Sequence, residues 1–291
     1  MTRVPIIGPI LLLTIAPTVV SVLAQSVVQP SSTAQQPDGL RAVHTLLMTR
    51  QISTWMDVPE PPYRVAITIK NKLERAGFRV VFDPTESHDA ALVISYQETP
   101  GQEYARLEQG TKILCEITLQ QPGDGAHGQN FAHRIEAATS WPTPVGSLYW
   151  DAVQHLEENP YYYYLGELLQ GWLTAQSDAG AVFSRMLRQP PLIISMGGED
   201  AQLTAQAAAN QVARLDAIRE LGRMKDKRAI ETLWELVERP NQQEREAALT
   251  AIGEMSDPAV LDRLIELRES QQETSMRALV EKVIARIRQL Q

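Results

Sequence analysis

Histidine and cysteine are the side chains in this sequence best suited to metal binding or nucleophilic chemistry. The histidines are scattered along the chain, at His44, His88, His127, His133 and His155. No two of them stand four residues apart, the spacing that places two ligands on one helix face. The only cysteine, Cys115, alternates with apolar residues in a run that predicts a strand with the thiol on its buried side. We therefore expect surface or structural histidines and a cysteine that packs in a core, with a reactive thiol as the alternative.

Catalytic sequence signatures are missing as well. The chain has no HExxH zinc motif, no GxSxG or SxxK serine motif, no phosphate-binding P-loop and no CxxC pair. A single cysteine also excludes an internal disulfide and a zinc site built from several cysteines of one chain. The sequence thus predicts a protein that is not an enzyme and that needs no cofactor and no metal.

A run of four tyrosines, Tyr161 to Tyr164, is the most unusual local feature. On a helix the first two can pack beneath Leu165 and Leu169, whereas Tyr163 should point away from that face. Two interpretations stay open at this point. The run forms part of a core and its rim, or it forms an aromatic platform for a glycan chain or a partner protein, because tyrosine combines a large apolar area with a polar tip.

Four cations gather in the segment RMKDKR, at Arg223, Lys225, Lys227 and Arg228. The chain as a whole is acidic, with a net charge of −8, which argues against nucleic acid as a partner. The cluster is either a solvated turn or a surface that attracts an acidic partner or an anionic membrane surface. Nearby Trp234 either packs between helices or serves as an anchor for a partner. With Tyr163, these five residues are the candidate partner-binding residues.

The cations and Trp234 lie inside a tandem repeat. Arg214 opens RLDAIRELGRMKDKRAIETLWEL, and Arg245 opens REAALTAIGEMSDPAVLDRLIEL 31 residues later. At this offset apolar residues align with apolar residues, Gly222 aligns with Gly253, and Asp226 aligns with Asp257. The spacing predicts two helices per repeat, in which the glycine ends the first helix in a left-handed conformation and the aspartate caps the second.

This pattern resembles the HEAT-like repeat family, and in particular its short bacterial subtype. The resemblance covers about 80 residues, within 205–291. It implies stacked helix pairs in an all-α solenoid whose surface binds a protein partner and performs no chemistry of its own. A third unit, MRALVEKVIARIRQL, lacks the glycine and the second helix, and we expect it to close the stack.

Residues 40–175 show a mixed pattern. A strand at 43–50 precedes a helix at 63–76, and further strands are expected at 78–82, 91–96, 113–119 and 131–138. Helices should follow from Pro144, capped by Thr143, and from Tyr161. A strand, a helix, several antiparallel strands and further helices predict a two-layer α+β sandwich. The segment LERAGFRVVFDPTESHDAALVISYQETPG resembles the small domains of bacterial envelope proteins, of the kind found at the N-terminus of TolB and in envelope-assembly lipoproteins.

The N-terminal residues have the pattern of an export signal. Arg3 precedes an uncharged apolar run that ends on Val22-Leu23-Ala24, small residues at the positions that a signal peptidase reads. We expect a signal peptide at 1–24 and a linker at 25–39, followed by the α+β domain at 40–175, a connector at 176–204 and the repeats at 205–291. An uncleaved N-terminal membrane anchor is the alternative.

The sequence therefore predicts an adaptor or scaffold of the bacterial cell envelope that is periplasmic or secreted and binds a protein partner through its repeats. It predicts no nucleic-acid partner and allows contact with the envelope surface. The alternative function is an envelope glycan-binding or glycan-processing protein that uses the N-terminal domain and the tyrosine-rich helix. A cleft with paired carboxylates would favour that alternative.

Overall fold

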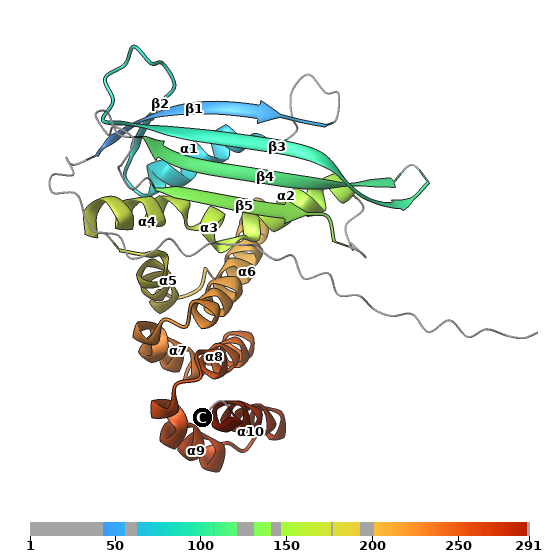
Figure 1. Ribbon diagram of the computed structural model, residues 1–291, viewed down its shortest axis with the longest axis vertical. Coiled ribbons are helices and arrows are strands. Elements are labelled where there is room, and N and C mark those ends of the chain that lie inside the picture. The colour runs from blue at the N-terminus through green and yellow to red at the C-terminus, as the bar shows by residue number, and fades with distance from the viewer. Residues whose placement is uncertain are drawn as a thin grey trace, which may run out of the picture.

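The computed structural model describes residues 43–55, 63–106, 108–120, 131–140, 147–175, 177–192 and 201–289. The expected signal peptide, the linker and the glycine-rich loop at 122–130 lie outside the described residues. The described chain begins with a five-stranded sheet covered by helices and continues into a helical region (Figure 1). This order agrees with the predicted succession of an α+β part and an all-helical part.

The sheet has the strand order β2-β1-β3-β4-β5. Its strands are β1 (Thr45–Ser53), β2 (Arg79–Val81), β3 (Ala90–Ala105), β4 (Glu108–Gln120) and β5 (Ala132–Ala138). The last three are antiparallel neighbours, as expected, but β1 lies inside the sheet and is parallel to both β2 and β3. Parallel pairing is possible because a helix connects β1 to β2 and carries the chain back to the same end of the sheet.

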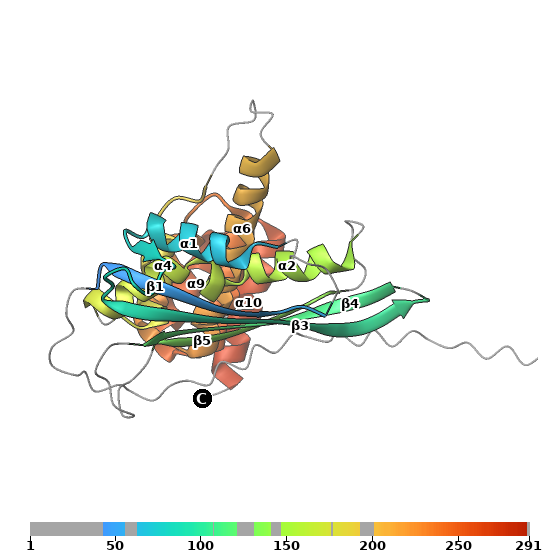
Figure 2. The same cartoon turned by 90° about the horizontal axis from the view of Figure 1, so that it is seen from above.

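One face of the sheet is covered by helices α1 (Val65–Arg75), α2 (Leu148–Glu158), α3 (Pro160–Tyr163) and α4 (Leu165–Gln170), as Figures 1 and 2 show. In β3 the residues on this face, Leu92, Ile94 and Tyr96, are fully buried, whereas Val93 and Ser95 between them are half-buried on the other face. The alternation has the period of two that a half-covered strand requires. The predicted two-layer α+β arrangement is confirmed.

Two predicted helix boundaries differ from the structure. Helix α2 begins at Leu148 after the extended residue Ser147, so a helix that runs on from Pro144 is wrong; the expected cap, Thr143, lies outside the described residues. The single helix expected from Tyr161 is wrong. Asn159 caps a short helix that Pro160 begins, Tyr164 leaves the helical conformation, and α4 then ends in a π-helical turn at Gly171–Ala175. The break at Tyr164 and the π-helical turn divide the run into three pieces.

Six helices form the C-terminal part: α5 (Ala179–Arg188), α6 (Ala201–Met224), α7 (Ile230–Val237), α8 (Gln242–Met255), α9 (Leu261–Ser270) and α10 (Thr274–Gln289). They stand in two rows, with α5, α7 and α9 in one and α6, α8 and α10 in the other (Figure 1). Within the rows α5 packs on α7, α6 on α8, and α8 on α10. The segment expected to be a connector thus contributes α5 as the first helix of a row.

The repeat glycines do not end their helices, so that expectation is wrong. Helices α6 and α8 continue past Gly222 and Gly253, and the left-handed residues that follow are Lys225, with φ of 52°, and Ser256, with φ of 55°. A β-carbon on Gly222 would stand 2.8 Å from the Cα atom of Ala251. The glycine is therefore required for the close approach of α6 and α8 rather than for a turn.

The repeat aspartates do act as caps. Asp226 accepts a hydrogen bond from the backbone N–H of Arg228, and Asp257 accepts one from Ala259. Each cap begins a short 3₁₀ turn, Lys227–Ala229 or Pro258–Val260, that leads into the second helix of its repeat. This feature of the repeat was predicted correctly from spacing alone.

Helix α6 connects the two parts of the molecule. It is contacted by α2 and α3 of the sheet region and by α5 and α8 of the helical region. The buried side chains of both parts form one continuous cluster that passes through Phe183 and Ala213. None of the described helices is long and apolar enough to cross a membrane.

Candidate functional site

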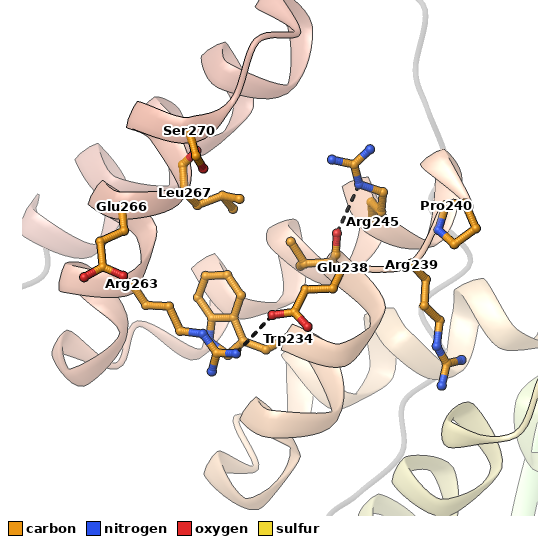
Figure 3. Close-up of a pocket in the computed structure, with 10 residues that line it drawn as sticks. Trp234, Glu238, Arg239, Pro240, Arg245, Arg263, Glu266, Leu267 and Ser270 are labelled. Carbon is orange, nitrogen blue, oxygen red and sulfur yellow. Dashed lines mark hydrogen bonds and ion pairs between the residues drawn. The ribbon is translucent and has the colours of Figure 1, made fainter.

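The helical region has a groove of about 740 Å³ between α7 and α9. Its walls come from α7, the loop after it, the start of α8, and α9 (Figure 3). The lining residues are Trp234, Val237, Glu238, Arg239, Pro240, Arg245, Arg263, Glu266, Leu267 and Ser270. Apolar and charged side chains therefore alternate around one concave surface.

Trp234 lies at the base of this groove and is only 3 % exposed. The guanidinium group of Arg263 stacks over its ring, 4.5 Å from the centroid. Arg263 also forms ion pairs with Glu231 at 3.2 Å and with Glu238 at 3.4 Å. The prediction that Trp234 packs between helices is confirmed, and only the edge of its ring contributes to the groove.

Arg245 stands on the wall opposite Leu267 and Ser270 (Figure 3). Its Nε atom donates a hydrogen bond to the carbonyl oxygen of Val237, at the C-terminal end of α7, with a distance of 3.1 Å. Its two terminal amino groups have no hydrogen-bond or ion-pair partner among the described residues. A half-buried guanidinium with free donors is a ready site for a carboxylate.

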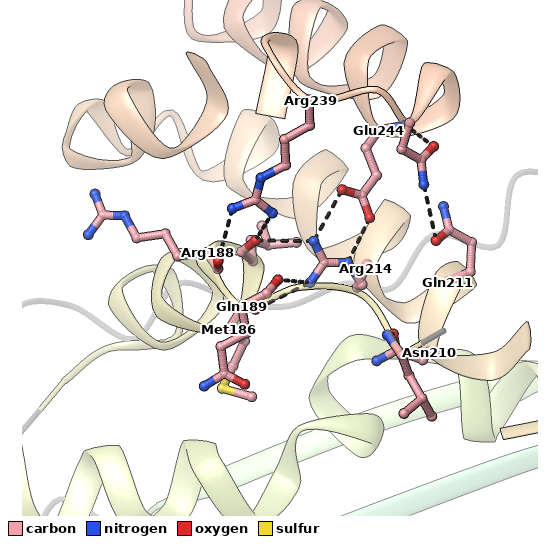
Figure 4. Close-up of polar contacts among 11 residues, drawn as sticks. Met186, Arg188, Gln189, Asn210, Gln211, Arg214, Arg239 and Glu244 are labelled. Carbon is pink, nitrogen blue, oxygen red and sulfur yellow. Dashed lines mark hydrogen bonds and ion pairs between the residues drawn. The ribbon is translucent and has the colours of Figure 1, made fainter. Parts of the chain in front are cut away.

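A buried ion pair closes the preceding helix junction, where α6 and α8 meet the C-terminal end of α5 (Figure 4). Arg214 donates from Nε and Nη2 to the two carboxylate oxygens of Glu244, at 2.7 and 3.1 Å. The remaining donors of its guanidinium bind the carbonyl oxygens of Met186, Leu187 and Gln189 at the end of α5. Arg214 is 1 % exposed and Glu244 fully buried, so every charge at this junction is satisfied inside the protein.

Arg239 completes the closure of that junction. Its two terminal nitrogens donate to the carbonyl oxygens of Leu187 and Arg188, at 2.8 and 2.9 Å. The C-terminal end of α5 is therefore covered by two guanidinium groups, which also complement the negative end of the helix dipole.

The basic turn is largely neutralised. Arg223 pairs with Glu220 at 3.0 Å, Lys227 with Asp257 at 3.1 Å, and Arg228 with Asp226 at 2.8 Å. Lys225 is exposed and forms no ion pair with another described residue. Lys227 and Arg228 thus brace the turns between repeat helices, Arg223 pairs within α6, and none of the four cations lines the groove.

The tyrosine run belongs to the core. Tyr161, Tyr162 and Tyr164 are 5 %, 0 % and 3 % exposed. Tyr163 is half-buried against the ammonium group of Lys72, which lies 5.1 Å from the ring centroid. The core-and-rim interpretation is confirmed for the run, although Tyr163 does not project as freely as the helical spacing predicted.

The candidate nucleophile and metal ligands also have structural positions. Cys115 is fully buried, and burial raises the pKa of its thiol to about 12, so the packing interpretation is confirmed. His133 packs edge-to-face on Phe131, with ring centroids 4.6 Å apart, and burial lowers its pKa to about 4. Within the described part of the chain, no three His, Cys, Asp or Glu side chains gather as a metal site.

Two carboxylates in the sheet region, the buried Glu98 and the half-buried Glu157, had no signal in the sequence. Glu98 accepts hydrogen bonds from the hydroxyls of Tyr96 and Tyr149, at 2.7 and 3.0 Å. Glu157 accepts one from Tyr63 and pairs with Lys72 at 3.0 Å. Burial, reinforced by Glu98, raises the pKa of both Tyr96 and Tyr149 well above the ordinary value. Both carboxylates are held by tyrosine hydroxyls, which is a structural arrangement.

A glycine motif at 123–128, GDGAHG, has the spacing of dinucleotide-binding loops. It lies outside the described residues, and the described elements on either side of it are the antiparallel strands β4 and β5. A dinucleotide site needs the motif between a strand and the N-terminus of a helix, where the helix dipole meets the pyrophosphate. This context does not support such a site.

Comparison with known families identifies the helical region. Residues 201–285 match the family model described as HEAT repeats, from the start of α6 into α10 and across the groove. No curated protein is similar enough to the chain to count as a match. The match supports a HEAT-like repeat protein, as the repeat pattern predicted, with its repeats placed after an N-terminal five-stranded sheet.

The groove residues other than Trp234 were not among the candidate partner-binding residues. Arg245 was noted only as the first residue of a repeat. The signal was present in the alignment of the two repeats, where Arg239 corresponds to Ser270 and Glu244 corresponds to Ser275. Two side chains that close the first junction are replaced by serines in the second.

Proposed function

We propose that this protein is a non-enzymatic adaptor of the bacterial cell envelope that binds a protein partner through its HEAT-like repeats. The groove between α7 and α9 is the observation that carries the proposal, because it combines a tryptophan edge, an apolar leucine and a guanidinium group with free donors. Tryptophan and arginine are the residues that most often dominate the energy of protein interfaces. HEAT repeats commonly mediate protein–protein interactions, which supports a partner of this kind.

Export to the periplasm or the exterior is part of the same proposal. It rests on Arg3, the apolar run after it and the Val22-Leu23-Ala24 motif. Intact-mass measurement on protein isolated from the envelope fraction tests it. A mature chain that begins at Gln25 or within a residue or two of it is expected, and retention of Met1 to Ala24 would favour the anchored alternative.

Site-directed photo-crosslinking in the envelope tests the partner-binding role. A benzophenone amino acid at Glu266, on the groove wall, is compared with the same amino acid at Lys282, an exposed position on α10 in the other row. We expect a discrete protein adduct from the groove position only. Equal adducts from both positions, or none from either, would contradict binding through this face.

The glycan-binding alternative stays a prediction without a described site. Three of its four tyrosines are buried, and the carboxylates of Glu98 and Glu157 are engaged by tyrosine hydroxyls. No observation among the described residues favours it over the adaptor.

A further inference from the structure

Two successive junctions of the helical region have the same construction, and their comparison indicates what the groove binds. At each junction the first residue of a repeat, Arg214 or Arg245, donates to carbonyl oxygens at the C-terminal end of a helix in the α5, α7, α9 row. The first junction is closed, with α5 packed on α7, and the second contains the groove between α7 and α9. The closed junction therefore serves as a reference for what an occupied groove would contain.

In the occupied junction a carboxylate completes the site. Glu244 holds the guanidinium of Arg214 with two parallel hydrogen bonds, the fork geometry in which arginine recognises carboxylates. Arg239 reaches across to the end of α5 and covers the junction from the other side. The pair is fully enclosed (Figure 4), which shows that this position in the repeat accommodates a carboxylate without steric conflict.

In the open junction both of these side chains are short. Ser275 corresponds to Glu244 and Ser270 to Arg239. Their hydroxyls are already used locally, since Ser275 donates to Glu273 and Ser270 donates to the carbonyl oxygen of Leu267. Arg245 therefore keeps one hydrogen bond, to Val237, where Arg214 has five. What the open junction lacks, relative to the closed one, is a carboxylate.

We propose that the groove between α7 and α9 binds a segment of a partner protein that carries a carboxylate, and that this carboxylate occupies against Arg245 the position that Glu244 occupies against Arg214. The inference rests on the proposed protein-binding function and specifies the chemistry of the partner. The edge of Trp234, Leu267 and Pro240 receive an apolar side chain next to the carboxylate.

The other charges of the groove disfavour a second acidic residue in the partner. Arg263 is neutralised by Glu231 and Glu238, and Arg239 is directed at the carbonyl oxygens of Leu187 and Arg188. Glu266 is exposed on the α9 wall and forms no ion pair with a described residue. It repels a run of acidic residues and favours a basic residue beside the carboxylate.

A pair of matched peptides tests the inference. The probes are Ac-GSGLSEGSGS-NH₂ and the same peptide with glutamine in place of glutamate, titrated against the full chain with the Nε–Hε signal of Arg245 followed by NMR. The glutamate peptide should shift this signal and bind at least about tenfold more tightly than the glutamine peptide, the difference expected for losing charge-assisted hydrogen bonds. Equal binding of the two peptides, or no shift with either, would overturn the inference.

Substitutions at Ser275 and Arg245 supply the matched controls. Ser275→Glu places a carboxylate of the chain itself at the equivalent of Glu244, so the glutamate peptide should lose at least about tenfold in affinity, whereas Ser275→Gln should leave it unchanged. Arg245→Met should abolish the preference for glutamate, with a circular-dichroism melt to confirm the fold. Preference for glutamate that persists in Arg245→Met would assign the binding to another residue and refute the proposal.

Crosslinking from Glu266 separates this inference from the proposed function. If the adduct at Glu266 forms equally in the parent and in Arg245→Met, the groove binds its partner without reading a carboxylate, and only the further inference fails. If no adduct forms in the parent, the partner-binding function itself fails.

Discussion

The guanidinium of Arg214 holds three helices together, because it starts from α6, binds the carbonyl end of α5 and pairs with Glu244 of α8. A charge buried to this degree is stable only while its partners remain, since removing one leaves the other uncompensated in a medium of low dielectric constant. Single substitutions at this pair should therefore have effects far larger than those of the exposed ion pairs in the same region.

We expect Glu244→Gln to lower the free energy of unfolding by about 3–5 kcal/mol, because it leaves the Arg214 cation buried without a counter-charge. Chemical denaturation followed by circular dichroism measures the loss. Glu231→Gln is the matched control, since Glu231 pairs with an arginine at the surface and its loss should be worth less than about 1 kcal/mol. Similar losses in the two variants would mean that the buried pair contributes no more than a surface pair.

His133 should make the protein sensitive to mild acid. Burial holds its pKa at about 4 in the folded protein, below the ordinary value of about 6.5 in the unfolded chain. As the pH falls from 6.5 to 4 the unfolded chain binds a proton that the folded protein excludes, so stability is present above this window and declines within it. His133→Phe should show a shallower decline over the same range in melts at several pH values. An identical pH dependence in the variant would assign the acid sensitivity to other groups.

For single residues, sequence patterns predicted which side chains are buried better than they predicted which partners those side chains contact. Period-two alternation correctly placed Cys115 in the core, and the alignment of Trp234 with Ile265 of the second repeat correctly predicted that Trp234 packs between helices. The same patterns could not reveal that Glu98 is held by two tyrosines or that Arg214 pairs with a residue 30 positions away, because these contacts depend on how separate elements meet. The ion pairs of the basic turn were also not predicted, since spacing does not show that Asp257 and Asp178 reach its cations.

Close helix packing, rather than turn geometry, explains the glycines of the repeats. The loop after each first helix is entered instead through a left-handed lysine or serine, at Lys225 and Ser256. A residue other than glycine in this conformation costs roughly 1–2 kcal/mol. Substitutions at Gly222 and at Lys225, both at the end of α6, should therefore change the free energy of unfolding in opposite directions.

We expect Gly222→Ala to destabilise the protein by about 1–3 kcal/mol, because the new methyl group would meet the backbone of Ala251. Lys225→Gly should stabilise it by up to about 1 kcal/mol, since it relieves the positive φ. Thermal melts of the two variants beside the parent measure both effects. Stabilisation by Gly222→Ala would mean that the higher helix propensity of alanine outweighs the close contact with Ala251.

The sequence predicted which helices and strands exist better than it predicted where they end and how the strands pair. The five strands and the helix before β2 were expected in their correct order, because alternation and the positive-φ residue Gly77 mark them in the sequence. The parallel position of β1 was missed, since nothing local distinguishes a central strand from an edge strand. The break in the tyrosine-rich helix was missed because apolar residues continue across it at helical spacing.

In the whole molecule, helix α6 links the sheet region to the helical region, because both pack on it. Helices α2 and α3 pack on it from the sheet side, and α8 packs on it from the repeat side. From the sequence, the two parts were expected to be separate domains joined by a connector. The shared helix and the continuous buried cluster couple them, so loss of packing in the repeats should be felt by the sheet.

We expect Leu249→Asp to increase the exchange of backbone amide hydrogens with solvent in both the helical region and the sheet region. Leu249 is fully buried on α8, and an unpaired buried charge costs several kcal/mol, comparable with the stability of a small domain. Hydrogen exchange followed by mass spectrometry should show lost protection in α8 and reduced protection in β3. Thr250→Asp, at the exposed neighbouring position, is the control and should change neither. Lost protection in α8 with β3 unchanged would show that the two parts fold independently.

Helix α6 also has a mechanical consequence. Its 24 residues form an unbroken rod roughly 36 Å long, and α-helices of this length resist bending far more than a loop does. A pull applied to the repeats reaches the sheet through this rod as shear along its contacts with α2 and α3, with no slack to be taken up first. Tension on one part of the molecule therefore turns the other part with it, and the distance between groove and sheet stays fixed under load.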